Sequence, residues 1–167
     1  ASMNPCPCGY FNHPEKECSC PPGTVQKYLN KISGPLLDRI DLHVEVTPVP
    51  FTELSNNTRQ SEKSEDIRLR VIKARAIQAE RYKDQEGVYA NAQISSKQLQ
   101  EICVINQAGQ NLLKTAMERL NLSARAYDRI LKVSRTIADL EGSIDIKTEH
   151  LAEAIQYRSL DRDNWGS

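Results

Sequence analysis

Long apolar runs, net charge and aromatic residues are all scarce in this sequence of 167 residues. No apolar stretch reaches the length that a membrane-spanning helix requires, and no signal-peptide pattern opens the chain. Lysine plus arginine and aspartate plus glutamate number 22 each, so a net charge of zero gives no electrostatic argument for a nucleic-acid partner. Helix-forming residues dominate the second half. We therefore expect a mainly α-helical, cytoplasmic protein.

A phosphate-binding loop is also missing. The pattern Gly-x-x-x-x-Gly-Lys-[Ser/Thr], whose backbone cradles nucleotide phosphates, occurs nowhere in the sequence. The first four residues, Ala-Ser-Met-Asn, look like the end of a strand rather than the start of a domain. We therefore expect this chain to be the C-terminal part of a longer protein and to hydrolyse no nucleotide by itself.

Cysteine is present, and its spacing is informative. Four of the five cysteines form two Cys-x-Cys pairs near the start of the chain: Cys6, Cys8, Cys18 and Cys20. Two such pairs joined by a short polar loop can bring four thiolates around one ion, and zinc prefers four tetrahedral ligands of this kind. His13 lies in the loop and is able to replace one cysteine. The alternative is four reduced thiols in a loop that its prolines hold in shape.

A short helical turn followed by a strand is predicted over residues 33–46. Gly34-Pro35 can begin a turn of helix, because proline fits the first helical position. Apolar and polar residues then alternate over residues 42–46 with the period of a half-buried strand. Asp38 and Arg39 lie on the tight connection between the two, so Arg39 is placed to reach out of its own domain. The competing interpretation is a structural clip between Arg39 and a neighbouring aspartate.

A polar stretch over residues 55–66 contains no apolar residue, and it predicts a linker between two domains. Helices follow almost without interruption. The first should bury a stripe of apolar residues: Ile67, Val71, Ala74 and Ile77. Its arginines, Arg81 among them, are expected to be solvated or paired with nearby carboxylates. Helix starts are predicted by a capping box at Ser95 with Gln98 and by caps at Asn106 and Ser123, and a helix end by Gly142.

Several of these segments resemble one family of proteins. Ser-Gly-Pro-Leu-Leu-Asp-Arg-Ile-Asp at residues 33–41 resembles the arginine-finger segment of the magnesium-chelatase-like AAA+ ATPases. Met-Asn-Pro-Cys-Pro-Cys-Gly at residues 3–9 looks like the sensor-1 segment of the ComM-type branch of that family. Residues 122–129 and 134–140 look like its sensor-2 helix. The resemblance runs over nearly the whole chain, and the combination of motifs is specific.

The resemblance implies a role for three polar residues. Asn4 would be the sensor-1 residue that orients the attacking water, Arg39 the arginine finger, and Arg125 the sensor-2 contact to the γ-phosphate of ATP. The residues themselves also allow other roles: a turn residue before a proline for Asn4, and a surface ion pair with Asp128 or Glu118 for Arg125. Arg125 lies in the first turn after a cap, where backbone N–H groups favour an anion. Arg129 and Arg135 are compatible with a purely structural role.

The predicted fold is thus the C-terminal tail of an α/β AAA+ core with a cysteine-rich, zinc-binding loop in residues 1–54, a linker over 55–66, and an all-helical lid in residues 67–167. By resemblance, the intact protein would bind ATP and Mg²⁺, form a hexameric ring, and drive branch migration of DNA in recombination and natural transformation. One alternative is a magnesium-chelatase motor subunit, although the Cys-x-Cys pairs argue against it. Another is a non-enzymatic, zinc-stabilised interaction domain.

Overall fold

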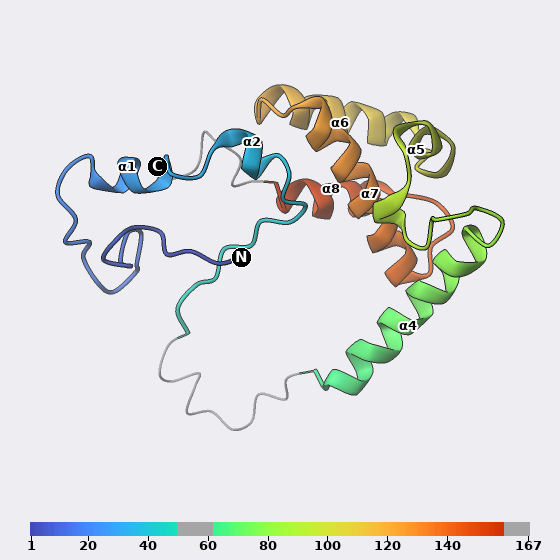
Figure 1. Cartoon of the computed structure of the whole chain (residues 1–167), viewed down its shortest axis with the longest axis horizontal. Helices are drawn as coiled ribbons and strands as arrows, with labels where there is room; N and C mark the ends of the chain where they lie inside the picture. The colour runs from blue at the N-terminus through green and yellow to red at the C-terminus, as the bar shows by residue number, and fades with distance from the viewer. Residues whose placement is uncertain (50–61, 159–167) are drawn as a thin grey trace.

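The structure, a computed structural model, describes residues 1–49 and 62–158 and consists of an extended N-terminal part and a helical bundle (Figure 1). Two short helices lie in the N-terminal part, α1 (Thr24–Leu29) and α2 (Gly34–Leu37). Proline in the first turn of α2 fits the prediction from Gly34-Pro35. The predicted mainly helical fold is confirmed for the described residues. Within these ranges, no helix is both long enough and apolar enough to cross a membrane.

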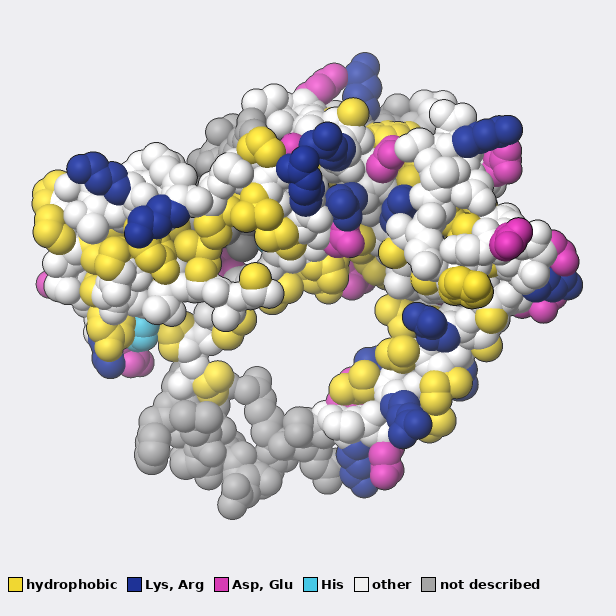
Figure 2. Space-filling model, viewed as in Figure 1, with side chains coloured by type: hydrophobic (Ala, Val, Ile, Leu, Met, Phe, Trp, Pro, Cys, Tyr) yellow, Lys and Arg dark blue, Asp and Glu magenta, His cyan; other side chains and the backbone are white. Residues whose placement is uncertain are grey.

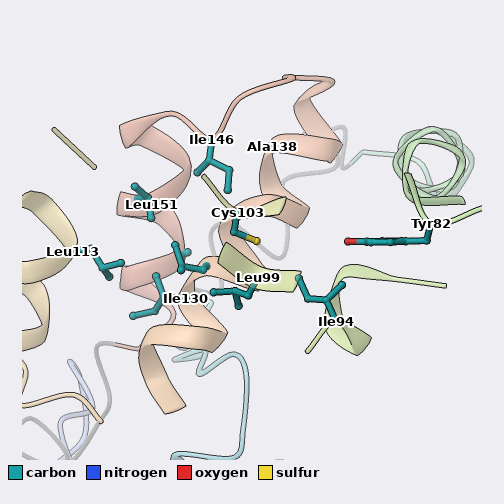
Figure 3. Close-up of a cluster of buried hydrophobic side chains, with 11 residues drawn as sticks. Tyr82, Ile94, Leu99, Cys103, Leu113, Ile130, Ala138, Ile146 and Leu151 are labelled. Carbon is teal, nitrogen blue, oxygen red and sulfur yellow. The ribbon is translucent and has the colours of Figure 1, made fainter. Parts of the chain in front are cut away.

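Helix α7 (Ala124–Glu141) lies at the centre of the bundle and contacts most of the other elements. These are α4 (Ser64–Arg81), the 3-10 turn η1 (Asn91–Gln93), α5 (Ser96–Ile102) and α8 (Thr148–Gln156), and the bundle also contains α6 (Gln107–Arg119). Helix α8 packs along α7 and also against α6. One apolar core joins them (Figure 3): Tyr82, Ile94, Leu99, Cys103, Leu113, Ile130, Leu131, Ala138, Ile146, Leu151 and Ala154. The core accounts for the apolar stripes of α6, α7 and α8, because each stripe faces the others.

Local signals in the sequence set the helix ends of the bundle as predicted. Ser95 and Gln98 form a capping box at the start of α5. The side chain of Asn106 accepts from the backbone N–H of the third residue of α6 at 2.8 Å, and Ser123 does the same for α7 at 3.2 Å. Gly142 ends α7 with φ 77, a left-handed conformation that glycine adopts without steric cost.

The strand predicted over residues 42–46 is wrong. This stretch is extended, but in the described part of the chain it pairs with no strand, and the β pairing there is one isolated bridge in the bundle. The exposure is also reversed, because Leu42 and Val44 are exposed whereas His43 is buried. Backbone groups of a strand need a neighbouring strand to bond with, and the described residues offer no sheet edge.

The buried stripe predicted for the first long helix is wrong for most of its length. Ala74 is 3% exposed, but Ile67, Val71 and Ile77 are exposed. Figure 1 shows the cause, since α4 meets the bundle only near its C-terminal end and extends away from it. Figure 2 shows hydrophobic side chains among basic ones on the surface of this helix at lower right. The apolar spacing of α4 therefore carried no information about how far the partner helices reach.

The predicted linker lies largely outside the described residues, which stop at 49 and resume at 62. Where the structure resumes, α4 begins at Ser64, inside the predicted linker range. Glu65 and Asp66 lie in the first turn of this helix, where their negative charges interact favourably with the positive end of the helix dipole. The first long helix therefore begins a few residues earlier than the apolar pattern indicated.

Candidate metal and nucleotide sites

The four clustered cysteines meet in space. Their Sγ atoms all lie within 4.8 Å of one another, and none of the four forms a disulfide. The Sγ of Cys6 lies 3.3 Å from that of Cys8 and 3.7 Å from that of Cys18, and the Cys8 and Cys18 sulfurs are 3.5 Å apart. A turn with Gly9 at φ 83 follows the first pair, and its N–H donates to the Cys6 carbonyl at 3.0 Å. The loop therefore folds back and places the second pair against the first.

These distances fit a metal ion with four thiolate ligands. Zinc–sulfur bonds of about 2.3 Å in a tetrahedron place the sulfurs about 3.8 Å apart, close to the separations found here. A disulfide would need about 2.05 Å between two sulfurs, far shorter than any of them. Cys6 is buried, and the other three cysteines are partly buried, so the cluster is sheltered from water. His13 is not part of the cluster and accepts a hydrogen bond from the backbone N–H of Glu15.

The closeness of the four thiols shifts their pKa values in opposite directions, down at Cys6 and Cys8 and up at Cys18 and Cys20. A backbone hydrogen bond from Tyr10 and smaller contributions from neighbouring thiols lower the pKa of Cys8 to about 5. At Cys20 a backbone hydrogen bond to Cys8 acts in the lowering direction, but desolvation and the three neighbouring sulfurs raise the pKa to about 12. Four thiolates at this distance repel one another, so the loss of a proton from one thiol makes the loss of a proton from its neighbours less favourable. A bound divalent ion removes this repulsion and allows all four to ligate.

Arg39 follows α2 on an exposed turn. Its guanidinium Nη1 donates to the carbonyl oxygen of Pro35 at 2.7 Å. Among the residues that the structure describes, no carboxylate pairs with it. The two aspartates that the clip interpretation requires have other partners: Asp38 lies 3.9 Å from Nη2 of Arg158, and Asp41 pairs with Arg129. Arg39 is therefore left available to a group outside the described chain.

Arg125 lies in the first turn of α7 and is exposed. The pairing with Asp128 is not found, because the Asp128 carboxylate accepts from the hydroxyl of Ser96 at 2.8 Å. Within the described ranges no carboxylate lies in ion-pair contact with Arg125. The backbone N–H of Ala126 donates to the side chain of the Ser123 cap. An anion at this helix start could therefore bind to the Arg125 guanidinium and to the other N–H groups of the first turn.

Asn4 precedes the cysteine cluster and is exposed. The described contacts do not join it to Arg39 or to Arg125, and these three residues lie on three separate segments. The structure thus brings the four cysteines together but does not assemble the three expected nucleotide contacts into one pocket. These three residues can therefore act together only on the phosphate groups of a nucleotide that other residues hold.

Arg135 has a structural role, which the sequence left open. It is buried, and its guanidinium donates to Asp139 at 3.1 Å and to the carbonyl oxygens of Ser143 and Ile144, each at 2.7 Å. Arg81 donates to the same carboxylate at 2.5 and 2.8 Å, so the expectation that it is solvated or paired with a neighbour in its own helix is wrong. Arg135 and Asp139 are four residues apart in α7, and this spacing is a sequence signal for their ion pair. No sequence signal indicated the ion pair between Arg81 and Asp139.

Comparison with known proteins adds a family to these observations. The family described as "Magnesium chelatase, subunit ChlI" matches residues 1–54, and that described as "Magnesium chelatase, subunit ChlI C-terminal" matches residues 61–158. The second match alone covers more than half of the chain.

Curated relatives agree with the family match. Competence protein ComM of Haemophilus influenzae is 43% identical over 162 residues, which are 97% of this chain and 30% of that protein. The uncharacterized protein YifB of Salmonella typhimurium is 38% identical over 162 residues, 97% of this chain and 31% of that protein. The chain therefore spans less than a third of the length of these relatives. It belongs to the magnesium-chelatase-like family of AAA+ ATPases, of the ComM/YifB type.

Proposed function

We propose that this chain supplies the sensor and arginine-finger residues of an ATP-driven, ring-forming motor, and that the motor acts on DNA. The observation that carries the proposal is the state of Arg39. It is exposed on a short turn, and both flanking aspartates are committed to other arginines. An arginine that acts in trans on the transition-state charge of a neighbouring subunit needs this freedom. The sequence resemblance assigns it the same role.

ATP and Mg²⁺ would be held mainly by a phosphate-binding loop in a protein of the relatives' length that contains this chain. Asn4 would orient the attacking water, because an amide can both donate and accept a hydrogen bond. Arg125 would contact the γ-phosphate from the helical bundle, which would then act as a lid that closes on ATP and opens on ADP. The ring would be a hexamer in the cytoplasm, as in the AAA+ proteins that the sequence resembles.

Branch migration of DNA is the proposed task of the motor. The name of the Haemophilus influenzae relative, competence protein, supports a role in DNA uptake and recombination. A magnesium-chelatase motor subunit is the alternative within the family, and the cysteine cluster disfavours it. The discriminating measurement is ATP hydrolysis by the protein of full length with and without branched DNA. Stimulation by branched DNA supports the proposal, whereas indifference to DNA contradicts the assignment of the substrate.

The role of Arg39 is tested by Arg39→Ala in the same protein. Loss of the finger should lower the turnover number by about 10³-fold or more and leave ATP binding nearly unchanged. Mixing this variant with one that lacks the phosphate-loop lysine should restore hydrolysis only where an intact site meets an intact finger. Arg119→Ala is the control, because Arg119 is also an exposed helix-end arginine. Normal turnover in Arg39→Ala rings would contradict the proposal.

The role of Arg125 is tested by the position of the bundle. A charge-assisted contact to phosphate contributes about 1.5–3 kcal/mol, which shifts a two-state lid by a factor of about ten or more. Arg125→Ala should therefore reduce the difference in lid position between ATP and ADP, while the free energy of unfolding stays near its original value. A distance probe between the cysteine loop, residues 5–22, and the bundle gives the readout. An unchanged nucleotide response would identify Arg125 as a surface residue only.

We also propose zinc as the ion of the cysteine cluster. Four thiolates without an open position suit structural zinc, and such a site has no place for a reactive water. The ion would fix the shape of residues 5–22. Metal analysis of the purified protein together with titration of its thiols tests this. One zinc per chain is the expected result, and four freely titrating thiols without metal would contradict it.

A further inference from the structure

The turn that carries Arg39 is bonded to the bundle at two places, which are the N-terminal half of α7 and the residues just after α8. Arg129 in α7 pairs with Asp41, and Arg158 just after α8 donates through Nη1 to the carbonyl oxygen of Ile40. Arg158 also approaches Asp38, and the backbone N–H of His43 donates to the carbonyl oxygen of Tyr157 at 2.8 Å. We call this set of contacts the latch: Asp38, Ile40, Asp41 and His43 on the turn, and Arg129, Tyr157 and Arg158 on the bundle.

Arg39 lies in the middle of the latched residues but takes no part in the latch. The residue before it and the two residues after it are held by bundle arginines. Its own guanidinium, among the described residues, bonds within the turn, to Pro35. Backbone on both sides of Arg39 is thereby fixed relative to α7 and α8. An exposed side chain on a backbone fixed at both sides has few orientations, which suits a group that must reach one point on a neighbouring subunit.

Burial makes the latch a strong connection rather than a loose surface contact. Arg158 is 1% exposed, and its guanidinium is a charge that water does not reach. A buried cation needs its partners, so pulling the turn away would leave it without the Ile40 carbonyl and the Asp38 carboxylate. Arg129 is less buried, with 31% of its side chain exposed, and can be replaced without opening the core.

We propose that Arg129 and Arg158 are positioning residues for Arg39, and that through them the helical bundle sets where the finger points. The proposal rests on the proposed function of Arg39 as an arginine finger. Arg125 and Arg129 lie in α7, one turn apart. A bundle that moves when Arg125 meets the γ-phosphate therefore moves the turn of Arg39 with it. The nucleotide state of one subunit thus reaches the ATP site of the next subunit.

The latch itself is tested on this chain without nucleotide. Arg129→Ala and Asp41→Ala should each lower the hydrogen-exchange protection of the His43 amide, which donates to Tyr157, by about tenfold. The double variant should lower it no further than one single variant, because both remove the same pair. The charge swap of Arg129→Asp with Asp41→Arg should recover protection. Arg70→Ala, which breaks an exposed pair with Glu62, is the matched control and should leave the amide unchanged.

Positioning is tested in rings of the protein of full length. Arg129→Ala should lower the turnover number by between about tenfold and a hundredfold, as expected for a displaced reactive group, without changing ATP affinity. The charge swap should recover turnover together with the protection of the His43 amide.

The outcomes separate the two proposals. Unchanged exchange at His43 in the latch variants would overturn the latch, whatever the ATPase shows. An open latch with normal turnover, in rings that Arg39→Ala still inactivates, would overturn positioning and leave the finger in place. Normal turnover in Arg39→Ala itself would overturn the proposed function and, with it, the positioning role. An open latch together with reduced turnover that the charge swap restores supports the proposal.

Discussion

Asp139 organises the polar interior of the helical bundle. Its side chain is fully buried and accepts from Arg81, Arg135 and Asn91. The amide of Asn91 also donates to Thr136, and its carbonyl accepts from the hydroxyl of Tyr82 at 2.7 Å. Three elements, α4, η1 and α7, thus meet at one carboxylate. A buried network in which each group has a partner fixes the relative positions of these elements more specifically than apolar contact alone.

Removing the charge of Asp139 should destabilise the bundle. Asp139→Asn leaves the two guanidinium groups without an anion, and breaking a buried pair in this way costs about 3–5 kcal/mol. Urea denaturation at neutral pH followed by circular dichroism measures the loss. Asp145→Asn, at an exposed position, is the control and should change the free energy of unfolding by less than about 0.5 kcal/mol.

The same carboxyl group should make stability fall in acid. Burial acts to raise the pKa of Asp139, but the hydrogen bonds from Arg81 and Asn91 outweigh it and lower the pKa below its ordinary value. A group whose pKa is lower in the folded state stabilises it above the unfolded pKa, about 3.9, and loses that contribution as the pH falls through the folded pKa. The wild-type chain should therefore lose stability below about pH 4 more steeply than Asp139→Asn. Equal slopes would contradict this assignment.

Arginines show how far single residues can be read from this sequence. Arg39 and Arg125 were singled out by motif, and the structure finds both exposed, although their catalytic roles stay predictions. Arg135 could be read as structural from its spacing to Asp139. Arg158 gave no signal at all and is nearly fully buried. Its burial depends on a turn more than a hundred residues away in sequence, and local patterns carry no such information.

Helix ends are the elements that local sequence fixes most directly in this bundle. A cap needs only a side chain and a backbone N–H two or three residues later, so its physics is contained in four residues. The caps at Ser95, Asn106 and Ser123 were accordingly predictable. The strand over residues 42–46 was not, because a strand depends on a partner that the described residues do not contain.

Replacing the cap of the central helix should have a moderate, local effect. Ser123→Ala removes the acceptor for the Ala126 N–H and should lower the free energy of unfolding by about 1 kcal/mol. Ser123→Asp keeps an acceptor at the same place and should retain most of the stability. Thermal unfolding of the three proteins gives the comparison, and equal melting temperatures for Ser123→Ala and wild type would show that the cap is not needed.

Exposure of α4 gives a test of where the bundle ends. Ile67→Lys and Val71→Lys lie on the part of α4 that extends from the bundle, so each should change the free energy of unfolding by less than about 0.5 kcal/mol. Leu131→Ala, which removes a side chain from the core, should cost about 2–5 kcal/mol. Chemical denaturation of this chain decides the matter. A large cost at Ile67 would mean that α4 packs along its whole length.

The whole molecule has two parts that are stabilised by different means. The bundle has an apolar core contributed by its helices, whereas residues 1–49 bury few apolar side chains, among them Cys6, Leu29 and Leu37. A segment of this size with so little buried apolar area needs a further source of stability, which a metal ion can provide. Among the described residues the latch connects the parts, and on the N-terminal side it lies at residues 38–43, beyond the cysteine loop.

Removing the proposed zinc ion should therefore unfold one part and spare the other. Structural zinc in small peptides contributes about 10 kcal/mol or more of apparent binding free energy, which far exceeds what the loop can gain by burial. A strong chelator should abolish the dispersed amide signals of residues 5–22 in an NMR spectrum, while the signals of the core residues around Cys103 and Leu131 keep their positions. Because the latch lies outside the loop, the protection of the His43 amide should also persist.

Cys8→Ser should act in the same way as the chelator, whereas Cys103→Ser, outside the cluster, should leave the loop signals intact. Loss of the bundle signals on chelation would show that the two parts fold as one unit.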